Sequence, residues 1–148
     1  MSILARTGSH AGALRVLSIA MGVFLIFMGL DKIGWLMDAG ILTRRLQEWR
    51  GMVRPFARWY LDTIAIPGAP VFARVVLLAE LSAGTALVLG IQVRLAAALA
   101  LLMVINFHVA ADVMFRYSYL TNAFGPPVLG SLLALAIGGL KLPFGVSR

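Results

Sequence analysis

The sequence contains no cysteine, and this removes several kinds of redox chemistry from consideration. Without a thiol the chain cannot form a disulfide relay, a thiolate metal site, a covalently attached c-type haem or a cysteine-ligated iron–sulfur cluster. It has only two histidines, His10 and His108, which makes the chain alone a poor candidate for a bis-histidine haem. One histidine with scattered carboxylates is also weak evidence for a metal ligand set. We therefore expect no metal site and no haem or cluster bound by this chain alone.

Charged residues are scarce as well, at 13% of the chain, whereas 61% of the residues are hydrophobic. The mean hydropathy of +0.93 lies outside the usual range of globular proteins. Four apolar runs carry the excess, at residues 14–30, 71–90, 95–115 and 123–140. Each run approaches or reaches the roughly 20 residues that cross about 30 Å of hydrocarbon. This pattern predicts that lipid, rather than water, surrounds most of the chain.

The first apolar run resembles a signal peptide, because basic residues precede an apolar core. No A-x-A cleavage motif follows it. We expect the helix to continue to about Met37 and to remain as a signal-anchor, with Trp35 in the aromatic belt of the membrane. The chain is thus predicted to be an all-α membrane protein with one domain over residues 1–148. Its four-transmembrane-helix bundle would have spans at about 14–37, 71–90, 94–115 and 123–140.

The segment 42–62, between the first two predicted spans, has the pattern of an interfacial amphipathic helix. Its apolar residues recur every three or four positions and form one stripe, and most of its arginines fall elsewhere on the helical wheel. The stripe consists of Leu42, Leu46, Trp49, Val53, Phe56 and Tyr60. Pro55 has no N–H group, so we expect a kink or two short helices. The segment is interpreted either as a collar at the membrane surface or as a docking surface for a partner subunit or an anionic lipid. The residues expected to contact lipid or a partner are Arg44, Arg45, Trp49, Arg54, Arg58 and Trp59.

The second predicted span contains a single carboxylate, Glu80, near its middle. An ionised side chain at that depth in a bilayer is costly, so Glu80 must be neutral, paired or turned toward other helices. Lys32, at the end of the first predicted span, is expected to snorkel to the lipid headgroups, with the alternative that it reaches inward to a carboxylate. Three glycines, Gly29, Gly84 and Gly90, are expected to allow close helix packing.

The third predicted span brings further polar residues toward Glu80. The short turn after the second span predicts a tight antiparallel hairpin that places Glu80 about one helical turn from His108. His108 and Asp112 are four residues apart and would share a helix face. Glu80, His108 and Asp112 are therefore expected to converge inside the bundle. Such a cluster is interpreted as a structural hydrogen-bond network, as a proton-relay or quinone-binding site, or, with the least support, as a metal site.

Several stretches of the sequence, taken in order, resemble the DoxX family of small four-helix bacterial membrane proteins. The family's glutamate corresponds to Glu80, its first-helix lysine to Lys32 and its post-turn arginine to Arg94. The first loop of this chain is unusually long and rich in arginine. The stretches that carry the resemblance are LRV at 14–16, FMGLDKI at 27–33, AELSAG at 79–84, LVLG at 87–90, RLAA at 94–97 and FGP at 124–126.

The resemblance implies a multi-pass protein of the bacterial inner (plasma) membrane that accompanies a redox enzyme. The family's name derives from a membrane subunit associated with thiosulfate:quinone oxidoreductase, and distant eukaryotic relatives act as assembly chaperones or cargo receptors. The leading hypothesis is a small integral accessory subunit of a respiratory or redox complex, which helps to shape a quinone or proton site around Glu80.

Two other functional hypotheses remain open at this stage. In one, the chain is itself the quinone-reactive oxidoreductase subunit, with Glu80 or His108 as proton acceptor. In the other, it is an assembly chaperone or structural scaffold without chemistry, so the sequence leaves open whether the protein is an enzyme. The expected partners are membrane lipids and larger membrane-protein subunits, with no nucleic acid, and a quinone is the only cofactor considered.

Overall fold

All regular structure in the described part of the chain is helical. The computed structural model describes residues 3–114, 116–140, 142–143 and 145, with side chains described from His10 onward. The three long helices are α1 (Ile3–Asp31), α4 (Ala69–Leu89) and α5 (Val93–Ala110). The shorter elements are η1 (Ile33–Leu36), α2 (Gly40–Arg50), α3 (Pro55–Tyr60), the π-helical turn η2 (Leu61–Ala65), α6 (Tyr117–Leu120) and α7 (Pro126–Gly138).

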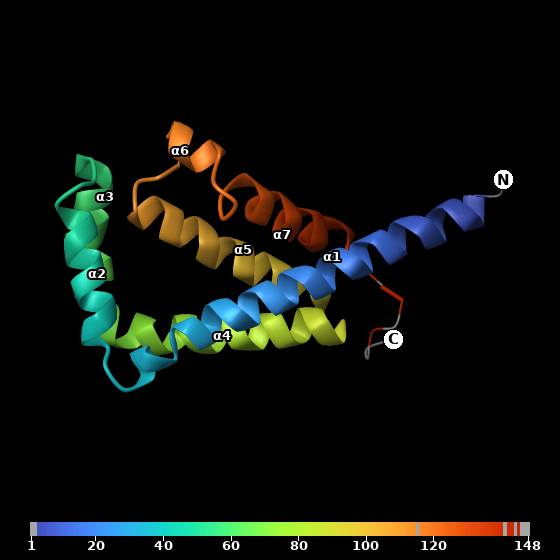
Figure 1. Cartoon of the computed structure of the whole chain (residues 1–148), viewed down its shortest axis with the longest axis horizontal. Coiled ribbons are helices and arrows are strands. Elements are labelled where there is room, and N and C mark those ends of the chain that lie inside the picture. The colour runs from blue at the N-terminus through green and yellow to red at the C-terminus, as the bar shows by residue number, and fades with distance from the viewer. Residues whose placement is uncertain (1–2, 115, 141, 144, 146–148) are drawn as a thin grey trace.

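Four helices pack side by side as a bundle (Figure 1). α1 lies against α4 and α7, and α5 lies against the same two helices, so the four close into a ring. α2 and α3 lie across one end of this bundle, while the first turns of α1 project beyond the other helices at the opposite end. This arrangement brings the C-terminal end of α1, the middle of α4 and one face of α2 close together.

Three of the helices have the length and composition needed to cross a membrane. They are α1 from His10 to Asp31, α4 and α5, and their outer faces carry exposed apolar side chains such as Val16, Val71 and Leu99. α7 has only 13 residues and therefore rises about 20 Å, less than the thickness of the hydrocarbon layer. The protein is thus an all-helical membrane protein with three candidate spans in its described part, and the predicted count of four is not confirmed.

The first and third predicted spans end earlier than predicted, while α1 begins at Ile3, before residue 14, and α7 covers only Pro126–Gly138 of the predicted 123–140. α1 stops at Asp31 and a 3₁₀ turn follows, so the predicted continuous helix to Met37 is wrong. α5 stops at Ala110 rather than at residue 115, which lies outside the described part of the chain. The backbone of Asp112 adopts a left-handed conformation with φ 52°, which no α-helix can continue through. By contrast, α4 agrees closely with the span predicted at 71–90.

α1 and α4 cross with their backbones in close contact at two glycines. A Cβ atom added to Gly22 would lie 2.7 Å from the Gly84 carbonyl oxygen, and one added to Gly84 would lie 2.8 Å from the Gly22 carbonyl oxygen. A Cβ at Gly29 would meet the Leu81 side chain at 2.9 Å. Small residues at a helix crossing permit this approach in membrane proteins. Gly22, which was not among the predicted packing glycines, is therefore the partner of Gly84.

The turn between α4 and α5 ends α4 with a Schellman motif. The Ile91 amide donates to the Ala86 carbonyl oxygen at 2.8 Å, and the amide of Gly90, which has φ 72°, donates to that of Leu87 at 3.3 Å. The buried Arg15 side chain donates to the carbonyl oxygens of Leu87 and Val88 at 3.0 and 2.7 Å. Gly90 thus serves the turn rather than helix packing, and a cation from α1 stabilises the C-terminus of α4.

The segment predicted to be interfacial forms two short helices, α2 and α3, separated at Gly51–Arg54, as Pro55 predicted. Its apolar face packs on the chain's own α4 and α5, with Leu42, Leu46 and Val53 buried in the same cluster as Ala73. Phe56 departs from the predicted stripe and is exposed. The break before Pro55 shifts the phase of the helical wheel, so that Ala57 takes the buried position instead.

Candidate functional site

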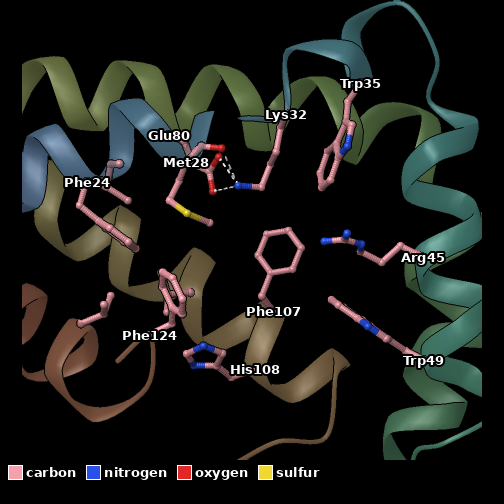
Figure 2. Close-up of a pocket in the computed structure, with 13 residues that line it drawn as sticks. Phe24, Met28, Lys32, Trp35, Arg45, Trp49, Glu80, Phe107, His108 and Phe124 are labelled. Atoms are coloured by element: carbon pink, nitrogen blue, oxygen red, sulfur yellow. Dashed lines mark hydrogen bonds and ion pairs between the residues drawn. The ribbon is translucent and has the colours of Figure 1, made fainter. Parts of the chain in front are cut away.

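A cavity of about 180 Å³ lies where the bundle meets α2. Figure 2 shows its lining, to which α1, η1, α2, α4, α5 and the start of α7 contribute. Most of the wall is apolar, and five of its side chains are aromatic. The polar lining residues are Lys32, Arg45, Glu80 and His108, and the others are Phe24, Leu25, Met28, Trp35, Trp49, Val104, Phe107, Phe124 and Val128.

Lys32 and Glu80 form a buried ion pair in the cavity wall (Figure 2). The lysine Nζ donates to Glu80 Oε1 at 2.9 Å, to Glu80 Oε2 at 2.8 Å and to the Met28 carbonyl oxygen at 2.8 Å. The two residues are only 8% and 5% exposed. The expectation that Lys32 snorkels to the headgroups is therefore wrong. Because α1 ends at Asp31, the lysine side chain turns back along the helix and meets the carboxylate of α4.

The same ammonium group lies near an aromatic ring. Lys32 Nζ is 5.8 Å from the centroid of the Trp35 ring, a distance at which the ring face attracts a cation. Trp35 is buried against the core beneath α2 and α4. It was expected in the aromatic belt of the membrane, and the structure places it in the cavity wall instead.

Arg45 and Trp49 reach the cavity from α2. They are four residues apart and so share one face of the helix. Figure 2 shows both side chains directed toward Phe107. Within the described part of the chain, the Arg45 guanidinium makes no hydrogen bond or ion pair. Both residues were expected to contact lipid or a partner, and in the structure they also line the cavity.

The other residues of that predicted contact set have separate positions. Arg44 pairs with Asp38 at 3.3 Å, and more than half of each side chain is exposed. Arg58 and Trp59 are exposed on α3. These three residues are placed to meet lipid headgroups or a neighbouring protein. Arg54 instead binds a carboxylate of its own chain, that of Asp112.

His108 lines the cavity and also a neighbouring one of about 280 Å³. Its Nδ1 lies 3.2 Å from the hydroxyl oxygen of Tyr119, and the two rings meet edge to face. Tyr119 belongs to α6, is buried, and has its pKa raised by that burial. The two cavities share His108, Phe107, Trp49 and Phe124 as a common wall. His108 is therefore the polar residue through which they adjoin.

Asp112 lies apart from the other predicted members of the polar cluster. It accepts hydrogen bonds from the Arg54 amide at 3.1 Å, from Arg54 Nη2 at 2.6 Å and from Arg116 Nη2 at 3.0 Å. The hydrogen bonds from the Arg54 side chain are the main reason that its pKa lies well below the usual range. Glu80 and His108 share the cavity, but Asp112 does not line it. The helical spacing used in the prediction does not hold beyond Ala110.

In the described part of the chain no three His, Asp or Glu side chains lie together, so no cluster of ligands there supports metal binding. The cavity is instead suited to an apolar, ring-containing ligand with a few polar atoms. The direction of Arg45 toward the cavity and the contribution of Phe24, Phe107 and Phe124 to its wall were not predicted from the sequence. The spacing of Arg45 and Trp49 on one helix face was the available signal for the first of these.

Comparison with known proteins identifies one family. The DoxX family model matches residues 13–113, about two thirds of the chain. The matched region contains α4, α5, the α2 and α3 segment and most of α1, with the Lys32 and Glu80 pair. Neither a curated protein nor a solved structure matches the chain.

Proposed function

This chain belongs to the DoxX family, and from that membership and the geometry of the cavity we propose that it is a small accessory subunit of a membrane redox complex that holds the ring of a quinone beside Lys32 and Glu80. The membrane is proposed to be the bacterial inner membrane. The larger partner subunits would carry the electron-transferring groups, because the chain has no cysteine for an iron–sulfur cluster or a c-type haem.

The cavity is the observation that carries this proposal. An engineered apolar cavity of about 150 Å³ admits benzene, so the 180 Å³ found here is enough for one six-membered ring. Phe24, Phe107 and Phe124 offer faces and edges on which such a ring can pack. Glu80 offers acceptors and Arg45 offers donors for the polar groups of the ring. A quinone combines these features, since it has a flat ring with oxygen atoms and an apolar tail that lipid can surround.

The position of the cavity also suits a ligand that arrives from the bilayer. Lys32 directly follows the apolar stretch of α1, and Glu80 lies within α4, which is long enough to span. The cavity lies at the end of an apolar helix and beneath α2, and we propose that this position falls between hydrocarbon and headgroups. A quinone ring held there would leave its tail among the acyl chains, and its oxygens would be within reach of a redox partner at the membrane surface.

Quinone binding can be measured from the chain's own fluorescence. Two of the three tryptophans, Trp35 and Trp49, line the cavity, while Trp59 is 56% exposed on α3. The full chain with Trp59→Phe, reconstituted in nanodiscs, is titrated with a short-tailed benzoquinone. We expect saturable quenching in the wild-type cavity and about a tenfold weaker affinity after Arg45→Met, because the guanidinium donors for a quinone carbonyl oxygen are then removed.

The matched control is Arg58→Met, which also removes one positive charge but lies outside the cavity. It should leave the quenching curve unchanged. Quenching that rises linearly, without saturation and equally in all variants, would mean that the quinone only partitions into the bilayer, and the proposal would be wrong.

The subunit role is tested separately in native membranes. Affinity purification of the tagged chain in mild detergent, followed by mass spectrometry, should recover an oxidoreductase in constant ratio. Recovery of the chain alone would contradict the proposed role as a subunit. A stable complex that keeps its quinone turnover after the Arg45→Met substitution would instead identify the chain as a structural scaffold.

A further inference from the structure

The lysine of the ion pair has no donor left for a ligand. An ammonium group carries three N–H bonds. Lys32 Nζ has three acceptors within 2.9 Å, namely the Met28 carbonyl oxygen and the two carboxylate oxygens of Glu80. A ligand in the cavity therefore finds this cation fully occupied, although it lies in the wall.

Glu80, in contrast, keeps free acceptor sites. A carboxylate has about four lone-pair positions on its two oxygens, and Lys32 is the one donor found for them among the described residues. This result does not depend on which member of the pair holds the proton. If the proton moves from Lys32 to Glu80, the new O–H group points back to the lysine nitrogen. The remaining lone pairs still accept hydrogen bonds, so this part of the cavity offers acceptors and no donors.

Arg45 has the opposite character. A guanidinium group has five N–H donors and no acceptor. Figure 2 shows the Arg45 side chain reaching from α2 toward the cavity. Among the residues that the structure describes, no carboxylate or carbonyl oxygen accepts a hydrogen bond from it. The cavity therefore has an acceptor wall at Glu80 and a donor wall at Arg45, which is exposed as a whole residue. The fourth polar lining residue, His108, has its Nδ1 against Tyr119 and can donate or accept through its other ring nitrogen.

From this polarity we infer that the cavity selects a ring with an O–H group, which donates to Glu80, over the same ring with carbonyl or ether oxygens alone. For a quinone this means that the reduced, hydroquinone form binds more tightly than the oxidised form. The inference rests on the proposed function, since it concerns the ligand of the same cavity. The O–H group donates to a Glu80 carboxylate oxygen, and the oxygen across the ring accepts from the Arg45 guanidinium. A carbonyl oxygen at the Glu80 wall would meet lone pairs without a donor, and buried polar groups left unpaired in this way reject ligands strongly.

Two redox-inert probes isolate the hydrogen bond. 4-Methoxyphenol has one O–H donor and one ether acceptor, whereas 1,4-dimethoxybenzene has the same ring with two acceptors. Each is titrated into the full chain in nanodiscs, with its partition into empty nanodiscs subtracted. We expect the phenol to bind at least about tenfold more tightly to the wild-type protein. The short-tailed hydroquinone, kept reduced under anaerobic conditions, should exceed its quinone by a similar factor.

Two variants test whether the difference between the two probe affinities depends on Glu80 and not on Arg45. Glu80→Gln supplies an amide that both donates and accepts, so the ratio of the two probe affinities should fall to about one. Arg45→Met removes the other wall and should weaken both probes without changing their ratio. Should Glu80→Gln fail to fold, the ratio in the wild-type protein and in Arg45→Met still tests the inference.

Equal affinities of the two probes for the wild-type protein would overturn the inference. If the quinone and its hydroquinone then both bind with saturation, the proposed function stands and only the selection fails. If neither quinone form binds with saturation, the proposed function fails as well. A ratio that stays high in Glu80→Gln would also overturn the inference, since the acceptor wall would lie elsewhere.

Discussion

Asp112 should be the residue that holds α3 to the end of α5, and three substitutions can separate its contributions. Its carboxylate accepts from the Arg54 amide and from the side chains of Arg54 and Arg116. Its backbone has φ 52°, a conformation that favours glycine and tolerates asparagine. Asp112→Asn keeps a hydrogen-bond acceptor and tolerates the left-handed backbone conformation. Asp112→Gly tolerates that conformation but has no acceptor, and Asp112→Ala has no acceptor and is strained in it.

The size of the effect follows from the contacts. The hydrogen bond to the Arg54 amide contributes about 1 kcal/mol to stability. The arginine side chains are 67% and 46% exposed, so water screens them and the ion pairs together contribute about 1 kcal/mol more. The left-handed backbone costs alanine roughly 1 kcal/mol. We therefore expect losses in free energy of local unfolding of about 1 kcal/mol for Asn, about 2 for Gly and about 3 for Ala.

Hydrogen exchange of the amides in α3 and η2 measures this loss in detergent or nanodiscs. A loss of about 2 kcal/mol raises the exchange rate about thirtyfold. Asp38→Asn is the control, because it neutralises the exposed carboxylate paired with Arg44 and should change stability by less than about 0.5 kcal/mol. If Asp112→Ala and Asp112→Gly exchange equally fast, the backbone argument is wrong. If none of the three differs from wild type, Asp112 does not hold α3.

Three further predictions concern other parts of the structure. Because the pKa of Asp112 is lowered in the folded state, the stability it contributes is present above the unfolded pKa of about 3.9 and is lost as the pH falls below it; the protection factors of the α3 amides, which are the intrinsic exchange rate divided by the observed rate at the same pH, should be constant from pH 8 to 5 and fall below about pH 4. Gly84→Ala should lower the unfolding free energy by about 1–3 kcal/mol in a detergent denaturation series, whereas Gly130→Ala, with open space around it, should be neutral or slightly stabilising. Lys32→Met or Glu80→Leu alone should lower it by about 3–5 kcal/mol, and the two together by clearly less, because each single change leaves one buried charge unpaired; equal losses would contradict the pairing.

The long apolar helices could be predicted from the sequence, because their positions follow from hydropathy alone. α4 and α5 begin within two residues of the apolar runs that predicted them, because hydropathy decides which segments enter lipid. The break before Pro55 was predicted for a local reason, since proline cannot donate the hydrogen bond that continues a helix. The end of α5 could not be predicted in this way. Residues 113–115 are as apolar as those before them, and hydropathy does not detect the positive φ of Asp112.

The candidate site was predictable in its members but not in its pairings. Glu80 was singled out because a lone carboxylate in an apolar run needs a partner. That partner depends on where α1 ends, because Lys32 turns inward only once the helix has stopped at Asp31. The periodicity of α2 identified its two faces correctly. Which neighbour each face meets is decided by tertiary packing, so the position of Arg45 in the cavity became visible only in the folded chain.

The short length of α7 has a consequence for the surrounding bilayer. If α7 lies across the bilayer beside the three candidate spans, its 13 residues leave roughly 10 Å of the hydrocarbon thickness unmatched, given a rise of about 1.5 Å per residue. Lipids beside this helix would then have to compress or tilt, at a cost of a fraction of a kcal/mol per ångström. A neighbouring protein that displaces those lipids would relieve the hydrophobic mismatch. We therefore expect the flank at α7 to be the side on which membrane elasticity favours association with another subunit.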